Sequence, residues 1–342
     1  MKLASFHHFR RNAIKKEEKI YMMTDTSKKY NNPIVLERAD PWIYKHTDGY
    51  YYFTGSVPGY QSIELRRAKT IDELKTTTEI KTVWISHETG PMSELIWAPE
   101  IHFINGKFYI NFAANSSATQ RNAINHHRMF VIENSNENPL EGEWVEKGQV
   151  KTHQESFSLD ATYFTHNDEL YYVWAQLEPT IPGNSNLYIS KMENPWTLKG
   201  KTLILTTPTY DWECIGYMVN EGPAVIIRNG KVFITYSGSA TDENYAMGLL
   251  WANADADLLD GFSWNKSEKP VFVSSEENKQ YGPGHNSFTT SEDGLEDLLV
   301  YHARPKKNEA GDPLDNPNRH ARVQAFTWSD DGFPVFGVPV AD

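Results

Sequence analysis

The chain has 342 residues, 13% of them aromatic, and carries 33 Lys and Arg against 45 Asp and Glu, a formal net charge of −12. Such a negative field repels nucleic acid and anionic membranes, and it favours a neutral or cationic ligand. The aromatic content is typical of strands and of surfaces that bind sugar rings. Composition therefore argues against a nucleic-acid partner and a membrane partner, and it leaves both an enzyme and a binding module open.

The first 29 residues are polar and basic, without an apolar segment of signal-peptide length. We expect residues 1–29 to be a poorly ordered extension and residues 30–342 to form one domain. No later segment approaches the ~20 apolar residues of a membrane-spanning helix. The single cysteine, Cys214, excludes an intrachain disulfide, so nothing indicates an oxidising compartment. Together these features predict a cytoplasmic protein.

Five segments of the chain share one pattern, which is a polar residue, a short strand-like run, a turn and then an aromatic or β-branched run. The segments begin with DPWIY at Asp40, WAPEI at Trp97, DATYF at Asp160, EGPAV at Glu221 and HNSFT at His285. Self-similarity at a regular period is the signature of a repeat architecture. The five segments therefore predict five copies of one structural unit.

A two-residue turn is predicted between the two strand-like runs of each segment. Four of the turns are Asp-Gly or Asn-Gly, the strongest short-range signal for a hairpin, and the third is Asn-Asp. The turns begin at Asp48, Asn105, Asn167, Asn229 and Asp293. Subtracting neighbours gives spacings of 57, 62, 62 and 64 residues, and a unit of about sixty residues holds the four strands of a propeller blade. We therefore predict an all-β, single-domain five-bladed β-propeller, with a two-sheet sandwich as the alternative.

In a propeller the first strand of every blade lines the central axis, so the residues that open the five segments should meet at one mouth. Buried like charges repel each other, so three acids at equivalent positions are hard to explain without a function. A carboxylic acid and a carboxylate on opposite faces of a sugar can cleave a glycosidic bond, with inversion when a water fits between. A third carboxylate can raise the pKa of the acid by charge repulsion. The pattern therefore indicates a glycosidase.

Six motifs, in their order along the chain, resemble those of glycoside hydrolase family 43, whose members are five-bladed propellers that act on arabinose- and xylose-containing polymers. The motifs are RADPWIY with Asp40, IWAPEIH with Trp97, SLDATYF with Asp160, VNEGPAV with Glu221, GPGHNSF with His285 and YHARP with Arg304. Two further runs, YYYFTGSVPGYQSIELRRAKTIDEL and DPLDNPNRHARVQ, resemble the exo-acting α-L-arabinofuranosidases of that family.

The resemblance implies three catalytic roles. Asp40 would be the general base that activates water, Glu221 the general acid, and Asp160 the residue that tunes and orients that acid. The expected activity is inverting release of L-arabinose from the non-reducing end of α-1,5-linked arabino-oligosaccharides or arabinan. The alternatives are a β-xylosidase or an endo-arabinanase on the same fold and, in a different class, a non-catalytic sugar-binding propeller.

The resemblance also implies binding residues. Trp97, His285 and Arg304 would shape the sugar pocket, and Arg322 would be a lesser substrate contact. No cofactor is expected to be required, although the family implies a structural calcium on the propeller axis near His285. Each assignment has a structural alternative, because Trp97 could pack between blades and His285 and Arg304 could be held in structural hydrogen bonds or ion pairs.

Two histidines and one acid remain without a site. His126 and His127 lack partners at a metal-binding spacing, which favours a role on the surface. The pair Glu213-Cys214 resembles the Glu-Cys of fructan-cleaving propellers. The Trp-Met-Asn-Asp-Pro opening of those enzymes is missing from this sequence, so the pair is assigned no catalytic role.

Overall fold

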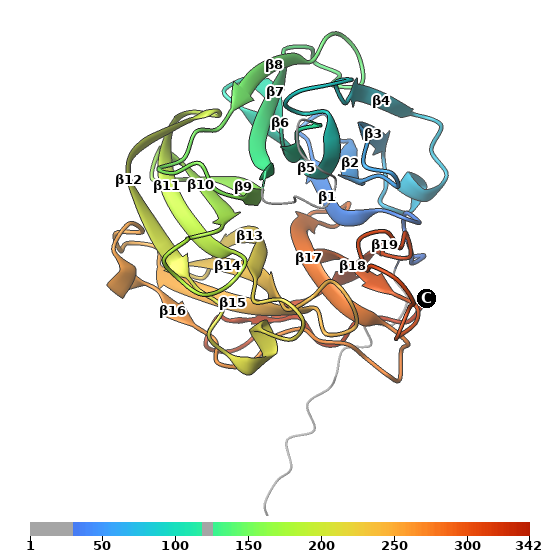
Figure 1. Cartoon of the computed structure of the whole chain (residues 1–342). Helices are drawn as coiled ribbons and strands as arrows, with labels where there is room; N and C mark the ends of the chain where they lie inside the picture. Colours follow the sequence, from blue (N-terminus) through green and yellow to red (C-terminus); the bar gives the residue numbers. More distant parts are fainter. Residues whose placement is uncertain (1–29, 118–125) are drawn as a thin grey trace, which may run out of the picture.

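The structure is a computed structural model that describes residues 30–117 and 126–342. Its main strands form five antiparallel sheets that radiate around one central axis (Figure 1). The predicted five-bladed β-propeller is therefore confirmed. The extension predicted over residues 1–29 lies outside the described residues. Among the described residues, no helix is long and apolar enough to cross a membrane.

Each blade is built from strands that follow one another along the chain, with the first strand innermost (Figure 1). Blade 1 contains β1 (Ala39–Lys45), β2 (Tyr51–Ser56), β3 (Ser62–Ala68) and β4 (Ile80–Ile85). Blade 2 contains β5 (Glu94–Ile104), β6 (Lys107–Asn115), β7 (Arg128–Asn134) and β8 (Val145–Gln149). Blade 3 contains β9 (Ser158–His166), β10 (Glu169–Gln176), β11 (Asn186–Asn194) and β12 (Thr197–Thr206).

The last two blades follow the same plan. Blade 4 contains β13 (Asn220–Arg228), β14 (Lys231–Gly238), β15 (Ala246–Asn253) and β16 (Asn265–Lys266). Blade 5 contains β17 (Tyr281–Thr290), β18 (Asp297–Arg304) and β19 (His320–Ala325), and a hairpin of β20 (Thr327–Trp328) and β21 (Pro334–Val335) follows it. Short 3₁₀ helices lie in the connections, namely η1 (Asp72–Lys75), η3 (Asp211–Glu213) and η4 (Gly261–Ser263).

The turn between the two innermost strands differs among the blades. In blades 2, 3 and 4 it has two residues, both with positive φ, beginning at Asn105, Asn167 and Asn229. In blades 1 and 5 the prediction of a two-residue turn is wrong, because the connections run over residues 46–50 and 291–296. There the side chains of Asp48 and Asp293 each accept a backbone hydrogen bond from two residues on. That local bond builds a turn inside a longer loop.

Apolar and aromatic side chains fill the spaces between neighbouring blades. Tyr52 of blade 1 and Phe108 of blade 2 are both completely buried, with ring centroids 5.8 Å apart. Trp174 of blade 3 is likewise buried, in the cluster that joins blades 2, 3 and 4. Burying a side chain such as that of Phe108 contributes about 1.5–3 kcal/mol. The five sheets are therefore held in a ring by packing between their faces.

The chain segment just before β1 closes the ring by pairing with β19 of blade 5. Ile34 N donates to Ala321 O and Ala321 N donates to Val35 O, each at 2.9 Å. The side chain of Asn32 continues this pairing, because its Nδ2 donates to Val323 O at 2.8 Å and its Oδ1 accepts from Val323 N at 2.9 Å. Blade 5 therefore gains its outer edge from a segment that lies before blade 1.

An extra residue interrupts the ladder between the first two strands of every blade. Such a bulge bends its strand and re-aims the side chains beside it. In each blade the innermost strand has a left-handed residue at a bulge, with φ between 42° and 55°, namely Asp40, Ala98, Asp160, Gly222 and His285. The ladders of blades 2 and 5 shift register twice, and their innermost strands have a second left-handed residue, Leu95 and Gly282. The repeat therefore includes a backbone distortion at the end of each strand that faces the site.

Replacing Asn32 by Ala should lower the free energy of unfolding by about 1–3 kcal/mol, because it leaves the N–H and C=O of Val323 unpaired at a half-buried seam. Urea denaturation followed by tryptophan fluorescence measures the change. Asn31→Ala is the matched control, since the exposed Asn31 side chain bonds only Asp72 on the surface, and it should cost about 0.5 kcal/mol or less. Equal losses in the two variants would contradict a role for Asn32 in closing the ring.

Candidate active site

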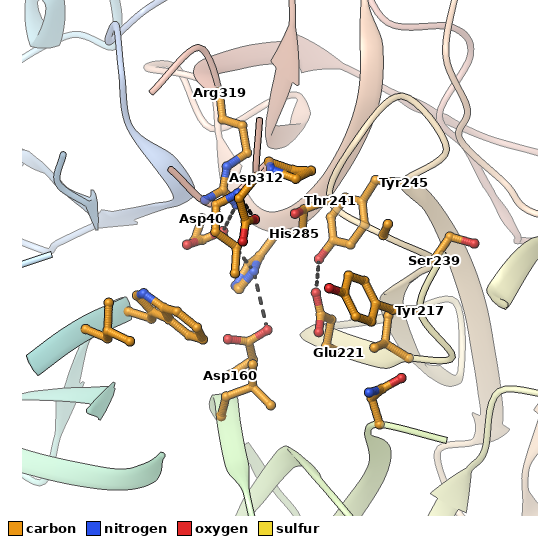
Figure 2. Close-up of a pocket in the computed structure, with 18 of the residues that line it drawn as sticks. Asp40, Asp160, Tyr217, Glu221, Ser239, Thr241, Tyr245, His285, Asp312 and Arg319 are labelled. Carbon is orange, nitrogen blue, oxygen red and sulfur yellow. Dashed lines mark hydrogen bonds and ion pairs between the residues drawn. The ribbon is translucent and has the colours of Figure 1, made fainter. Parts of the chain in front are cut away.

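A pocket of about 370 Å³ opens at one end of the axis and is lined by residues of all five blades. This volume lies in the range of small-molecule sites. Its lining includes every residue that opens one of the five repeated segments, namely Asp40, Trp97, Asp160, Glu221 and His285. Figure 2 shows the three acids of this set around His285. The sequence repeat therefore does bring these side chains to one place.

His285 is the central cation of the pocket. Its Nδ1 lies 3.2 Å from Asp40 Oδ1 and 3.5 Å from Asp160 Oδ2, and all three side chains are about nine-tenths buried or more. Burial alone would lower the pKa of His285, but the charges of Asp160 and Asp40 outweigh it and raise the pKa to about 10. The imidazole is therefore an imidazolium at neutral pH, and it holds carboxylates from blades 1 and 3 together.

Asp40 is held ionised by its neighbours. Burial would raise its pKa, but His285 and Arg319 keep the pKa well below its usual value. Arg319 Nη1 lies 3.5 Å from Asp40 Oδ1, and Ser56 Oγ donates to Asp40 Oδ2 at 2.5 Å. His302 Nδ1 accepts the Asp40 backbone N–H at 3.1 Å, and burial lowers the His302 pKa well below 6.5, so that neutral ring forms no ion pair with Asp40.

Glu221 is in the opposite protonation state. Burial and the charge of Asp160 raise its pKa to about 8, although a hydrogen bond from Tyr245 OH to Glu221 Oε1 at 2.8 Å lowers it in part. Burial also raises the pKa of Asp160 to about 6, against the opposing charge of His285. Because Glu221 and Asp160 interact, they lose their protons in two steps that belong to the pair. At neutral pH the proton of the pair resides mainly on Glu221.

Trp97 forms part of the apolar wall of the pocket. The indole is 8% exposed and stacks on His127, with ring centroids 4.0 Å apart and an interplanar angle of 19°. One face of the indole is therefore covered by protein. The prediction of a surface role for His127 is wrong, because this ring is completely buried and its Nε2 lies 3.0 Å from Leu95 O. Its place behind Trp97 explains the burial.

The structure places the two predicted arginines outside the pocket lining. The Arg304 guanidinium donates to the carbonyl oxygens of Thr241 and Pro313, and so joins two loops that do line the pocket. Arg322 is fully buried and pairs with Asp342 at 2.9 Å. Arg322 thus makes no contact with the pocket, and Arg304 acts on its shape only through backbone.

Arg319 and Tyr245 are pocket residues that the sequence analysis missed. Arg319 belongs to the same NRHAR run as Arg322, three positions earlier. In an extended chain, residues an odd number of positions apart point to opposite sides. Arg319 therefore points into the pocket, whereas Arg322 points away from it. Tyr245 carries no comparable signal, because its contact with Glu221 depends on the path of the connection that leads into β15.

A model of the family described as glycosyl hydrolases family 43 matches residues 30–334. The chain belongs to this family. The resemblance predicted from the six motifs is therefore confirmed. Family membership also agrees with the solved structures, because a crystal structure of α-L-arabinofuranosidase from Lactobacillus brevis is 57% identical, with a TM-score of 0.89 over 91% of this chain and 97% of that one.

Two curated relatives belong to Streptomyces species and carry the same name, extracellular exo-α-(1→5)-L-arabinofuranosidase. The relative from Streptomyces avermitilis is 55% identical over 92% of this chain, and this chain spans 64% of its length. The relative from Streptomyces chartreusis is 52% identical, covering 83% of this chain and 85% of that protein. The family member described here is thus similar over most of its length to two arabinofuranosidases.

These relatives correct the predicted compartment. Both are named extracellular, so the expectation of a cytoplasmic protein is wrong. That expectation rested in part on Cys214, the single cysteine, which cannot form an intrachain disulfide. A ring held by packing between blades needs no disulfide, so its cysteine count does not report the redox state of its surroundings.

The surroundings of His285 offer little to an axial calcium. Calcium takes six to eight oxygen ligands, whereas the described residues contain no group of three or more His, Cys, Asp or Glu side chains placed to hold a metal ion. The Nδ1 of His285 is already engaged by Asp40 and Asp160. The residues present therefore do not form a cage for the ion, and the axial calcium stays a prediction.

Replacing Gly222 by Ala should disturb the site more than the fold. A Cβ at Gly222 would lie 3.0 Å from His285 Cγ and 3.2 Å from its Cα, and φ is +55°. The left-handed backbone costs about 1–2 kcal/mol, and displacement of His285 should lower kcat/KM about tenfold or more. Gly230→Ala is the matched control, because φ is +71° with open space around the added Cβ.

Thermal unfolding and hydrolysis kinetics of the two glycine variants distinguish backbone strain, which both variants share, from the contact with His285, which only Gly222→Ala makes. Both variants should lose similar stability, whereas only Gly222→Ala should lose activity. If kcat/KM falls equally in the two variants, or is unchanged in Gly222→Ala, the contact between Gly222 and His285 does not constrain the site.

Proposed function

We propose that this protein is an inverting exo-α-L-arabinofuranosidase that releases L-arabinose from the non-reducing end of α-1,5-linked arabino-oligosaccharides. Membership of family 43 and the similarity to arabinofuranosidases support this proposal. The observation that carries it is the difference in pKa between two acids that line one pocket. Asp40 has a pKa far below its usual value, whereas the pKa of Glu221 is raised to about 8.

This difference suits a single displacement across the glycosidic bond. Asp40 accepts a proton from a water molecule as the water oxygen attacks the anomeric carbon. The bond from that carbon to the leaving oxygen breaks, and Glu221 gives its proton to the leaving oxygen. The sugar leaves with the opposite anomeric configuration, and exchange with solvent restores the two protonation states. Because the transition state resembles an oxocarbenium ion, even a weakly basic carboxylate can position the attacking water.

Asp160 and His285 would set the protonation states of the two catalytic acids. Asp160 raises the pKa of Glu221 by its charge, and its Oδ2 also accepts the backbone N–H of Gly222 at 3.1 Å. His285 lies between Asp40 and Asp160 and keeps Asp40 ionised. The His285 imidazolium thus favours the ionised form of Asp40 and limits the repulsion among the three carboxyl groups of the pocket.

The wall between blades 5 and 1 supports an exo mode of action. The connection from β18 to β19 reaches blade 1, where Tyr60 OH donates to Leu314 O and Arg319 Nη2 donates to Tyr60 OH at 3.0 Å. Tyr60, Leu314 and Arg319 all line the pocket. A wall at this point would let a chain end enter and would obstruct the passage of an internal unit.

Alanine variants of Glu221 and Asp40 test the proposed roles on the background of the active protein. The unmodified protein should release inverted L-arabinose from linear 1,5-arabino-oligosaccharides, detected by proton NMR of the first product. Glu221→Ala should slow this reaction by ~10²–10⁴-fold but spare aryl arabinofuranosides, whose phenol departs with little protonation. Asp40→Ala should depress both reactions alike, because water attack is needed in each. Equal losses on both substrates in Glu221→Ala, or retention of configuration, would refute the assignment.

On the alkaline side, kcat/KM should fall as Glu221 loses its proton, and the pKa of Glu221 places this fall at about pH 8. The active form of Glu221 is protonated, so a raised pKa extends activity upward. Asp160→Asn removes the negative charge that raises this pKa, so the alkaline limb of kcat/KM should move to lower pH. Asp168→Asn removes the same charge from an exposed turn of blade 3 and should leave the limb in place. An unmoved limb in Asp160→Asn would contradict the tuning role.

A further inference from the structure

Glu213 is a completely buried carboxylate that does not line the pocket. Its Oε2 accepts the backbone N–H groups of Thr209 and Tyr210 at 2.7 and 2.8 Å, and its Oε1 accepts Tyr236 OH at 2.8 Å. Lys266 Nζ lies 2.7 Å from Oε1 and balances the charge. A buried carboxylate with this many donors is a fixed point of the structure.

Asn220 connects this fixed point to the proposed acid, because it directly precedes Glu221 at the start of β13. Its Nδ2 donates to Glu213 Oε1 at 3.0 Å, and its Oδ1 accepts from Thr206 Oγ1 at 3.2 Å. Its backbone N–H donates to Ser185 O at 3.1 Å. Asn220 is therefore held both by its own blade and by blade 3, and it is completely buried.

The backbone after Glu221 leaves the ladder, and Gly222 N–H donates instead to Asp160 Oδ2 at 3.1 Å. The ladder pairs Glu221 with Ser237 and is then interrupted by the bulge before Ala224. Gly222, in the bulge, has a left-handed backbone. The Glu221 side chain is held at its tip by Tyr245 (Figure 2). The position of its carboxylate is therefore set by Tyr245 at its tip, by the Gly222–Asp160 bond on one side and by Asn220 on the other.

We propose that Glu213 is a positioning residue for the general acid and acts through Asn220. This inference rests on the proposed function, in which Glu221 protonates the leaving oxygen. A misplacement of about 1 Å can cost about a hundredfold in rate. Its effect should be largest where the proton is needed, which is at a basic leaving oxygen. Loss of the link should therefore resemble a weaker form of the Glu221→Ala defect.

Glu213→Gln tests the link by replacing one carboxylate oxygen with an NH₂ group, and it also removes the negative charge that Lys266 balances. A carboxylate accepts donors on both oxygens, whereas the amide of Gln presents an NH₂ group to one set of them. In one orientation of the amide, the NH₂ group faces the donors Asn220 Nδ2 and Tyr236 OH. In the other orientation it faces the backbone N–H groups of Thr209 and Tyr210. Asn220→Ala removes the other end of the same link and leaves the remaining partners of Glu213 in place. Tyr236→Phe is the matched control, because it deletes a donor to Glu213 without touching Asn220.

The three variants are compared by kcat on a linear arabino-oligosaccharide and on an aryl arabinofuranoside, with circular dichroism and urea denaturation as checks of folding. Glu213→Gln and Asn220→Ala should raise the ratio of aryl to oligosaccharide activity about tenfold. Tyr236→Phe should lose stability and leave this ratio unchanged. If Glu213→Gln unfolds, Asn220→Ala still tests the link.

The outcomes separate this inference from the proposed function. If the unmodified protein does not hydrolyse the oligosaccharide, the proposed function fails. If it does, and Glu221→Ala loses only the oligosaccharide reaction, the function stands. The inference is then overturned when Glu213→Gln and Asn220→Ala lose both reactions in equal proportion, or when Tyr236→Phe shifts the ratio as much as they do.

Discussion

The His285 imidazolium between Asp40 and Asp160 is the interaction on which the whole site depends. Three carboxylates that line one pocket would repel each other, and each would lose part of the water around its charge. A single buried cation offsets part of both costs, because it lies within 3.5 Å of two of the three acids. Arg319 adds a second positive charge beside Asp40. The remaining acid, Glu221, has no such neighbour within ion-pair distance among the described residues, and so its proton stays.

The backbone distortion repeated in every blade explains how short strands can direct the charged side chains into the pocket. A regular strand alternates its side chains between the two faces of a sheet, where neighbouring blades cover them. The bulge inserts one residue with a left-handed backbone, at Asp40, Asp160 and His285 in three of the blades. In blade 4 the left-handed residue is Gly222, so the acid stands one position earlier. Glu221 is therefore not the strict structural equivalent of Asp40, although the sequence repeat aligns them.

Much of this arrangement could be predicted from the sequence, because it rests on local patterns. Turn residues at a spacing of about sixty define the blades, and the residues that open the repeats lie where an axial strand must begin. The rest depends on contacts between distant segments. Nothing near Tyr245 indicates that it meets Glu221, and nothing near His127 indicates that it stacks behind Trp97. The sequence analysis named Arg322 and did not consider Arg319, because telling the two apart requires the exact position at which β19 begins.

The seam between blades 5 and 1 has a consequence for how this protein loses function. Asp40 belongs to blade 1, whereas His285, His302 and Arg319, which surround it, belong to blade 5 or to the connection into its last strand. The same junction is closed by the pairing of β19 with the segment before β1. Parting of these two blades would separate the base from His285 and Arg319, its two counter-ions, while most sheets stayed intact. Inactivation by heat or denaturant should then follow the opening of one junction, ahead of the melting of the five sheets.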